Sequence, residues 1–141
     1  MNSAVANFVL HPQLAADTAP VGDFPLCRVL LMDDSRYPWF LLVPRVVEDI
    51  RELHDLTDAE RHKLSDESAR LARAMSAQFS PHKLNVAAIG NMVPQLHVHH
   101  VARFQGDPAW PATVWGRHPP LRYPTPAKVE LVKTMRTALG I

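Results

Sequence analysis

The segment that most constrains the fold is Gln95–Arg103, QLHVHHVAR, which alternates as a β-strand requires. Successive side chains of a strand point to opposite faces of the sheet. One face then carries Gln95, His97, His99, Val101 and Arg103, and the other carries Leu96, Val98, His100 and Ala102. Two imidazoles therefore stand side by side, and near pH 7 an imidazole can serve as base, acid, nucleophile or metal ligand. We interpret this face as a functional site rather than a packing surface.

Composition describes an ordinary globular chain, with 47% hydrophobic residues among 141, and one domain over residues 1–141 is expected. Fifteen Lys and Arg residues oppose fourteen Asp and Glu residues without a basic block, which argues against binding to nucleic-acid polymers. The N-terminus lacks the pattern of a signal peptide or membrane span, so a cytoplasmic protein without membrane contact is expected. The single cysteine, Cys27, lies in an apolar run and is expected to be a buried thiol.

Hydrophobic periodicity and turn residues predict strands first and a long helix after them. The capping box of Thr57 and Glu60 predicts a helix over 58–79, with Glu67 among the charged residues of its polar face. A last helix is expected from Thr125–Pro126 to Gly140. The expected strands are 26–33 and 39–43, which form a hairpin, then 84–89 and 95–104. Residues 1–25 are expected to be irregular, apart from a short strand at 8–10 and a helical turn at 14–17.

This order of elements is typical of an α+β domain with a largely antiparallel sheet. Within it, three interpretations of His97 and His99 stand open. They are exposed residues of an edge strand, or two ligands of a metal site, or a nucleophile and its neighbour acting on a phosphate. The metal interpretation needs a third ligand, and no H-E-x-x-H or C-x-x-C motif supplies one.

The segment Asn85–His99 resembles the signature region of the histidine triad (HIT) family, in which three alternating histidines follow a Gly-Gln element. The hairpin with Asp33 and the run Trp39–Arg45 supports the resemblance, which covers residues 24–105 as a core and leaves 106–141 as a C-terminal extension. The chain most resembles a proteobacterial branch of HIT-family or diadenosine tetraphosphate hydrolases, in which Gln takes the first His position. A HIT-like fold and a homodimer are what this resemblance implies.

The resemblance also implies a reaction: a nucleotide hydrolase or nucleotidyl transferase that cleaves at the α-phosphate through a covalent nucleotidyl-histidine. His97 would be the nucleophile, His99 would contact the phosphate, and Gln95 would stand at the first His position. Asp33 would bind the ribose, and Asn85, Asn91 and the backbone N–H of Met92 would bind the phosphate. No metal and no cofactor is expected. The alternatives are a nucleotide-binding module with little catalysis and an H-x-H metal-binding protein.

The chain departs from the family pattern at three positions. Gln95 loses an ionisable group, although its backbone carbonyl can still orient His97. Trp39 stands where some members carry a further His. His100 replaces an apolar residue, and because strand alternation turns it away from the site, we interpret it as structural. Two tryptophans, Trp110 and Trp115, are expected to hold the extension on the body of the protein. The other histidines are expected outside the site: His11 in a turn, His54 and His62 exposed, and His118 in the Pro-rich extension.

Overall fold

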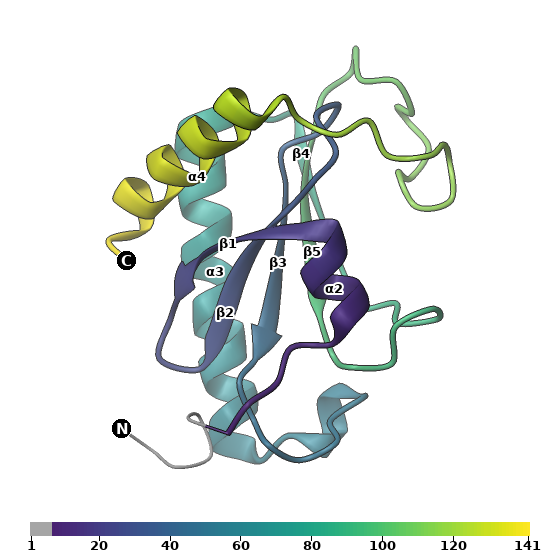
Figure 1. Ribbon diagram of the computed structural model, residues 1–141. Coiled ribbons are helices and arrows are strands. Elements are labelled where there is room, and N and C mark those ends of the chain that lie inside the picture. Colours follow the sequence, from purple (N-terminus) through teal and green to yellow (C-terminus); the bar gives the residue numbers. More distant parts are fainter. Residues whose placement is uncertain (1–6) are drawn as a thin grey trace.

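A five-stranded antiparallel sheet organises the structure, a computed structural model that describes residues 7–141 (Figure 1). The strands are β1 Thr18–Asp23, β2 Cys27–Met32, β3 Trp39–Pro44, β4 Lys83–Ala87 and β5 Val98–Arg103. The helices are α2 Pro12–Asp17, the short 3-10 turn η1 Leu53–Asp55, α3 Asp58–Phe79 and α4 Thr125–Leu139. The strand order is β1-β2-β3-β5-β4, and every neighbouring pair is antiparallel. The α+β prediction is confirmed.

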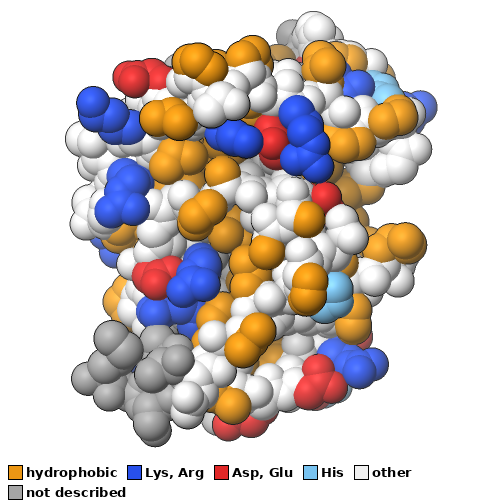
Figure 2. All heavy atoms as spheres, in the orientation of Figure 1, with side chains coloured by type: hydrophobic (Ala, Val, Ile, Leu, Met, Phe, Trp, Pro, Cys, Tyr) orange, Lys and Arg blue, Asp and Glu red, His pale blue; other side chains and the backbone are white. Residues whose placement is uncertain are grey.

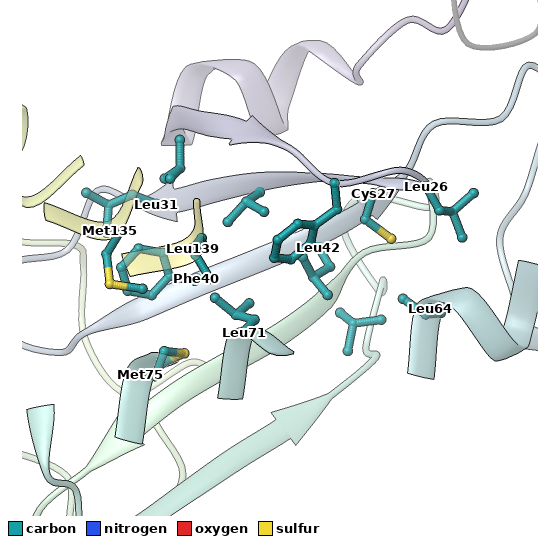
Figure 3. Close-up of a cluster of buried hydrophobic side chains, with 14 of the residues drawn as sticks. Leu26, Cys27, Leu31, Phe40, Leu42, Leu64, Leu71, Met75, Met135 and Leu139 are labelled. Carbon is teal, nitrogen blue, oxygen red and sulfur yellow. The ribbon is translucent and has the colours of Figure 1, made fainter. Parts of the chain in front are cut away.

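One face of the sheet is covered by the two long helices, α3 and α4, and the main core lies between the sheet and these helices. α3 starts where predicted. The Thr57 hydroxyl accepts from the backbone N–H of Glu60, and the Glu60 carboxylate accepts from the backbone N–H of Thr57. Figure 3 shows side chains from β2 and β3 meeting those of α3 and α4 in this layer. Its members include Leu31, Phe40, Leu42, Leu71, Met75, Met135 and Leu139.

The opposite face of the sheet is covered by the short helix α2 and by a segment without regular secondary structure. α2 crosses it on one side, and the segment 105–124, which we call the tail segment, crosses it on the other (Figure 1). A second cluster forms under them, with Leu14 from α2, Leu41 from β3 and Val114 from the tail segment. The predicted face of the histidine strand points into this layer, so the candidate site lies between α2 and the tail segment.

The N-terminal region differs from the prediction. Residues 8–10 form no strand, whereas Thr18–Asp23 forms β1, which the sequence analysis missed. β1 contains Pro20 and Gly22, two residues that are poor in central strands and tolerated at an edge or a bulge. β1 is indeed an edge strand, and its register with β2 shifts between these two residues. The helical turn expected at 14–17 is the end of α2.

Glu67 also differs from the prediction, because it is buried on the inner side of α3 rather than exposed on its polar face. Its carboxylate accepts from the backbone N–H of Leu26 at 2.9 Å and of Cys27 at 2.7 Å, at the start of β2. Cys27 is buried as expected, and burial raises the pKa of its thiol.

Within residues 7–141, no helix is long and apolar enough to cross a membrane. Figure 2 shows acidic and basic side chains interspersed over the face it presents.

Candidate functional site

His97 and His99 meet at the start of β5, on the face opposite the long helices. Their ring centroids are 4.9 Å apart, and the rings cross at 68°. Both residues are nearly covered, with 6% and 5% of their surface exposed. β5 lies between β3 and β4, where His99 stands opposite Leu41 and Ala87. Two neighbouring strands therefore fix the backbone that carries the pair.

The ring of His97 is oriented by its own chain. Its Nδ1 lies 2.7 Å from the backbone carbonyl oxygen of Gln95, which can only accept, so the proton is on Nδ1. Nε2 then keeps its lone pair. Burial lowers the pKa of His97, which keeps this ring neutral near pH 7. The carbonyl contact that the sequence analysis expects is present, and it leaves Nε2 available as a nucleophile.

His99 is held in the other tautomer by Trp39. The indole N–H of Trp39 donates to Nδ1 of His99 at 3.0 Å, so the proton of the neutral ring is on Nε2. The ring also lies against Trp115, with centroids 5.4 Å apart. Burial, followed by the neighbouring charges of His97 and His100, lowers the pKa of His99 to about 3. His99 is thus a neutral N–H donor beside a neutral ring whose Nε2 keeps its lone pair.

His100 points into the helix side of the sheet and takes no part in this pair. Its Nε2 lies 2.7 Å from the Ser68 hydroxyl on α3, and its Nδ1 lies 3.1 Å from the carbonyl oxygen of Val98. It is completely buried, and that burial lowers its pKa to about 4. Because both ring nitrogens have partners, the side chain fills a packing position without an unpaired polar atom.

The side chain of Gln95 turns away from His97 and binds the segment before α2. Its Oε1 accepts from the backbone N–H of His11 at 2.8 Å, and its amide nitrogen donates to the backbone carbonyl oxygen of Val9 at 3.0 Å. His11 is therefore drawn to the edge of the site, which the sequence analysis did not predict. The two residues are 84 positions apart, and no local pattern connects them.

Asp33 lies at a cavity of about 340 Å³ between the β2–β3 turn and the tail segment. Neither His97 nor His99 lines this cavity, but Trp39 and Trp115, which both pack on His99, do. Its carboxylate accepts from the N–H of Tyr123 at 2.9 Å, from Arg122 at 3.0 Å and from Lys128 at 3.2 Å. Burial opposes ionisation, but these bonds prevail and lower the pKa of Asp33. The cavity is lined by Asp17, Met32, Asp33, Asp34, Trp39, Val114, Trp115, Gly116, His118, Pro120 and Arg122.

Three other predicted residues are not brought to His97 by contacts of their side chains. Asn85 lies half-buried on β4, and its Oδ1 accepts from Arg103 at 2.8 Å. Arg103 is itself fully buried and paired with Asp107, whose pKa falls to about 2 because bonds from Arg103 and backbone N–H groups outweigh burial. Asn91 and Met92 are exposed in the loop between β4 and β5, and Met92 is 92% exposed. That loop also borders a small cavity of about 20 Å³ at His97.

Of the two tryptophans in the tail segment, Trp115 lies over the site and Trp110 does not. Trp115 packs against Trp39 and His99, and its indole N–H is buried without a hydrogen-bond partner within residues 7–141. Trp110 lies against His82 and Arg103, farther along the sheet. In the part of the chain that the structure describes, no three His, Cys, Asp or Glu side chains converge in a way that could hold a metal ion.

Comparison with known proteins identifies the family. A family model described as the HIT domain matches residues 13–106. The chain belongs to the HIT family. The resemblance of its histidine strand to that family is thereby confirmed, and the match also takes in α2 and β1, which precede the expected core at residue 24.

Solved structures of histidine triad proteins match this HIT protein over nearly its whole length. One from Marinobacter aquaeolei is 47% identical, covers 94% of this chain and 96% of its own, and has a TM-score of 0.91. One from Bradyrhizobium japonicum is 42% identical, with 94% and 98% coverage and a TM-score of 0.91. One from Sinorhizobium meliloti is 35% identical, with 95% and 98% coverage and a TM-score of 0.92. No curated protein matches the chain. The predicted HIT-like fold and the proteobacterial kinship are confirmed.

Proposed function

We propose that this HIT protein is a nucleotide hydrolase or nucleotidyl transferase that cleaves at the α-phosphate through His97. The observation that carries the proposal is the pairing of tautomers. His97 has its proton on Nδ1 and a lone pair on Nε2, while His99, 4.9 Å away, has an N–H on Nε2. A nucleophile and a hydrogen-bond donor thus stand together, which is what attack on an anionic phosphate requires.

The proposed reaction has two displacements. Nε2 of His97 forms a bond to the α-phosphorus, and the bond from that phosphorus to the leaving group breaks, with the electron pair departing on the leaving group. In the hydrolase, the oxygen of a water molecule then attacks phosphorus, the P–N bond breaks, and a nucleoside monophosphate leaves. The water releases one proton to solvent, and His97 returns to its neutral form. Gln95 holds Nδ1–H throughout, so the ring keeps its orientation.

The cavity beside His99 is the proposed nucleoside site. Its volume of about 340 Å³ lies in the range of small-molecule pockets. Trp39 and Trp115 offer aromatic surface for a base, and the unpaired N–H of Trp115 offers a donor. Asp33 borders the same space, and a carboxylate that accepts three bonds still has a lone pair for a ribose hydroxyl.

The phosphate contacts proposed for Asn85, Asn91 and the backbone N–H of Met92 complete this assignment. Asn91 and Met92 share the loop that borders the small cavity at His97, so a movement of that loop would bring donors to the phosphate. Asn85 would have to act through its amide N–H groups, because its oxygen is already bound by Arg103. No metal or cofactor enters this mechanism.

The test is to trap the covalent intermediate. The protein is mixed with adenosine 5′-phosphoramidate or a diadenosine polyphosphate, quenched, and mapped by mass spectrometry for AMP attached to His97. His97→Ala should lose AMP release by more than about a thousandfold and still bind AMP in calorimetry. A matched control, His54→Ala, removes an exposed histidine, 84% of whose side chain is accessible, and should keep full activity. AMP release by His97→Ala at the normal rate would refute the proposal.

A second function is favoured by one observation: His97 and His99 are only 6% and 5% exposed, and a tryptophan lies on His99. A nucleotide-binding module with little turnover fits such a covered pair. It predicts that the unmodified protein binds AMP but forms no adduct and releases no product from either substrate. The trapping experiment therefore separates the two functions directly.

We also propose that residues 1–141 act as one domain in the cytoplasm and pair as a homodimer. The tail segment and α4 support a single unit, because Asp33, directly after β2, binds Arg122 and Lys128 of that region. The open edge of the sheet at β4 is the surface proposed for the contact between the two copies.

A further inference from the structure

Gln95 stands where the family pattern has its first histidine, but its side chain is fully engaged elsewhere. The amide oxygen accepts from the backbone N–H of His11 at 2.8 Å, and the amide nitrogen donates to the backbone carbonyl of Val9 at 3.0 Å. The same residue binds His97 through its backbone carbonyl at 2.7 Å. Gln95 therefore joins two histidines, one through its side chain and the other through its main chain.

The tautomer of His11 is fixed by the start of α2. Its Nδ1 accepts from the N–H of Gln13 at 3.0 Å, so the proton of the neutral ring is on Nε2. Within residues 7–141, this Nε2–H has no hydrogen-bond partner, although the residue is half-buried. The electrostatic influence of His11 is among the causes that lower the pKa of His97, after burial, in keeping with the contacts that Gln95 makes to both residues.

The position of α2 shows which part of a substrate His11 would meet. Asp17, the last residue of α2, lines the cavity beside His99, whereas His11 caps the opposite end of the helix and binds Gln95. A six-residue helix is about 9 Å long, and this length separates the Asp17 end of α2 at the cavity from the His11 end at Gln95. With the nucleoside in the cavity and the α-phosphorus at His97, the portion beyond the phosphate extends toward His11.

The other histidines near the site are committed elsewhere. The Nε2–H of His99 is the donor proposed for the phosphate, since Trp39 occupies its Nδ1. Nε2 of His118 lies 2.9 Å from the Tyr37 hydroxyl, and Nε2 of His100 is bound by Ser68 on the far face. We propose that His11, positioned by Gln95, takes the place of the absent first histidine and donates its Nε2–H to the leaving group. This inference rests on the proposed function.

The step stays balanced without a proton transfer from His11. Nε2 of His97 bonds to phosphorus, the phosphorus–oxygen bond to the leaving group breaks, and the departing oxygen keeps the electron pair. The N–H of His11 stabilises that oxygen by a hydrogen bond as its negative charge develops. The leaving group then takes its proton from solvent. Because no proton leaves its Nε2, the ring of His11 keeps the bond that its Nδ1 accepts from Gln13.

The test compares two AMP esters that differ only in the leaving group, phenyl and p-nitrophenyl. Phenolate is a poor leaving group and needs the donor, whereas p-nitrophenolate spreads its charge and leaves unaided. His11→Asn is the informative variant, because Asn can still cap α2 while losing the imidazole. It should slow release of phenol about 100-fold and release of p-nitrophenol less than about 10-fold. His54→Ala is the matched control and should change neither rate.

A second variant tests the role of Gln95 as a positioning residue. Gln95→Ala keeps the backbone carbonyl for His97 but removes both bonds to Val9 and His11. It should reproduce the selective loss on the phenyl ester, and adding His11→Asn should cause little further loss, because both changes remove one interaction. Independent, multiplicative losses would show that Gln95 does not act through His11.

Each outcome decides between the two proposals. Equal loss on both esters, or none, in a folded His11→Asn protein overturns the role of His11 and leaves the proposed function intact. If the unmodified protein releases AMP from neither ester and forms no adduct on His97, the proposed function fails, and the inference fails with it. Circular dichroism and thermal unfolding of each variant confirm that the comparison is between folded proteins.

Discussion

His99 and His100 are adjacent in sequence, yet the pleat of β5 sends them into different surroundings. His99 accepts a bond from Trp39 on the site face, and His100 is bound to Ser68 on the helix face. Burial dominates both environments and lowers the two pKa values to about 3 and about 4. Both rings are therefore neutral in the folded protein, where an exposed histidine would titrate near 6.5.

This neutrality predicts how stability depends on pH. As pH falls below 6.5 the unfolded chain takes up protons at these histidines while the folded chain does not, so the free energy of unfolding must decrease. For His100 the loss is on the order of 3 kcal/mol and is complete near pH 4, its folded pKa. Urea unfolding between pH 6.5 and 5.5 measures the slope of this loss, above the range where most carboxylates of the unfolded chain titrate.

The control for this prediction is His100→Gln, which keeps a polar group near Ser68 but cannot titrate. Its free energy of unfolding should fall less steeply over the same pH range than that of the unmodified protein. A slope equal to that of the unmodified protein would assign the pH dependence to other groups.

Among the elements, α3 contributes more than an apolar stripe. Its buried Glu67 accepts from two backbone N–H groups at the start of β2, at 2.9 and 2.7 Å. These are groups that the antiparallel ladder leaves to be satisfied where the strand begins. The helix and the strand are therefore joined by a buried carboxylate as well as by the core shown in Figure 3.

Glu67→Gln should lower the free energy of unfolding by about 2 kcal/mol, because an amide has one accepting oxygen for two N–H groups and charged acceptors bind more strongly. Asp66→Asn is the matched control. It removes the same charge from an exposed neighbour on α3 and should change stability by less than about 0.5 kcal/mol. Denaturant unfolding of both variants tests this, and similar effects of the two changes would contradict it.

Elements with strong local signals were predictable from sequence, and contacts between distant segments were not. The capping box at Thr57 gave the start of α3, and the alternation around His97 gave the faces of β5. β1 was not predicted because it contains Pro20 and Gly22, which are unfavourable in a strand interior and tolerated at a sheet edge. Glu67 looked exposed because its partners are 40 and 41 residues away in sequence. For the same reason the position of His11 in the site came only from the structure.

At the scale of the molecule, the sheet has one edge that carries apolar surface. β4 is the last strand in the sheet order, and Val86 on it is 51% exposed. Beside it an apolar cavity of about 370 Å³ opens between α3 and β4, lined in part by Leu53, Leu64 and Val98. An open edge with apolar neighbours invites pairing with another chain. We propose that a second copy covers it in the homodimer.

Val86→Arg should convert the proposed dimer into a monomer, because it places a charge where the two edges would meet. Val129→Arg is the control, since Val129 on α4 is also exposed, at 60%, and lies outside this edge. Size-exclusion chromatography with light scattering gives the mass of each protein. A monomeric unmodified protein, or a dimeric Val86→Arg variant, would rule out this interface.

The carboxylate of Asp33 has one last consequence. It borders the cavity and also anchors Arg122 and Lys128, which precede and begin the final helix. A hydroxyl that takes the lone pair left free on Asp33 shares one carboxylate with those two cations. Occupancy of the pocket and attachment of the C-terminal helix therefore meet at a single side chain.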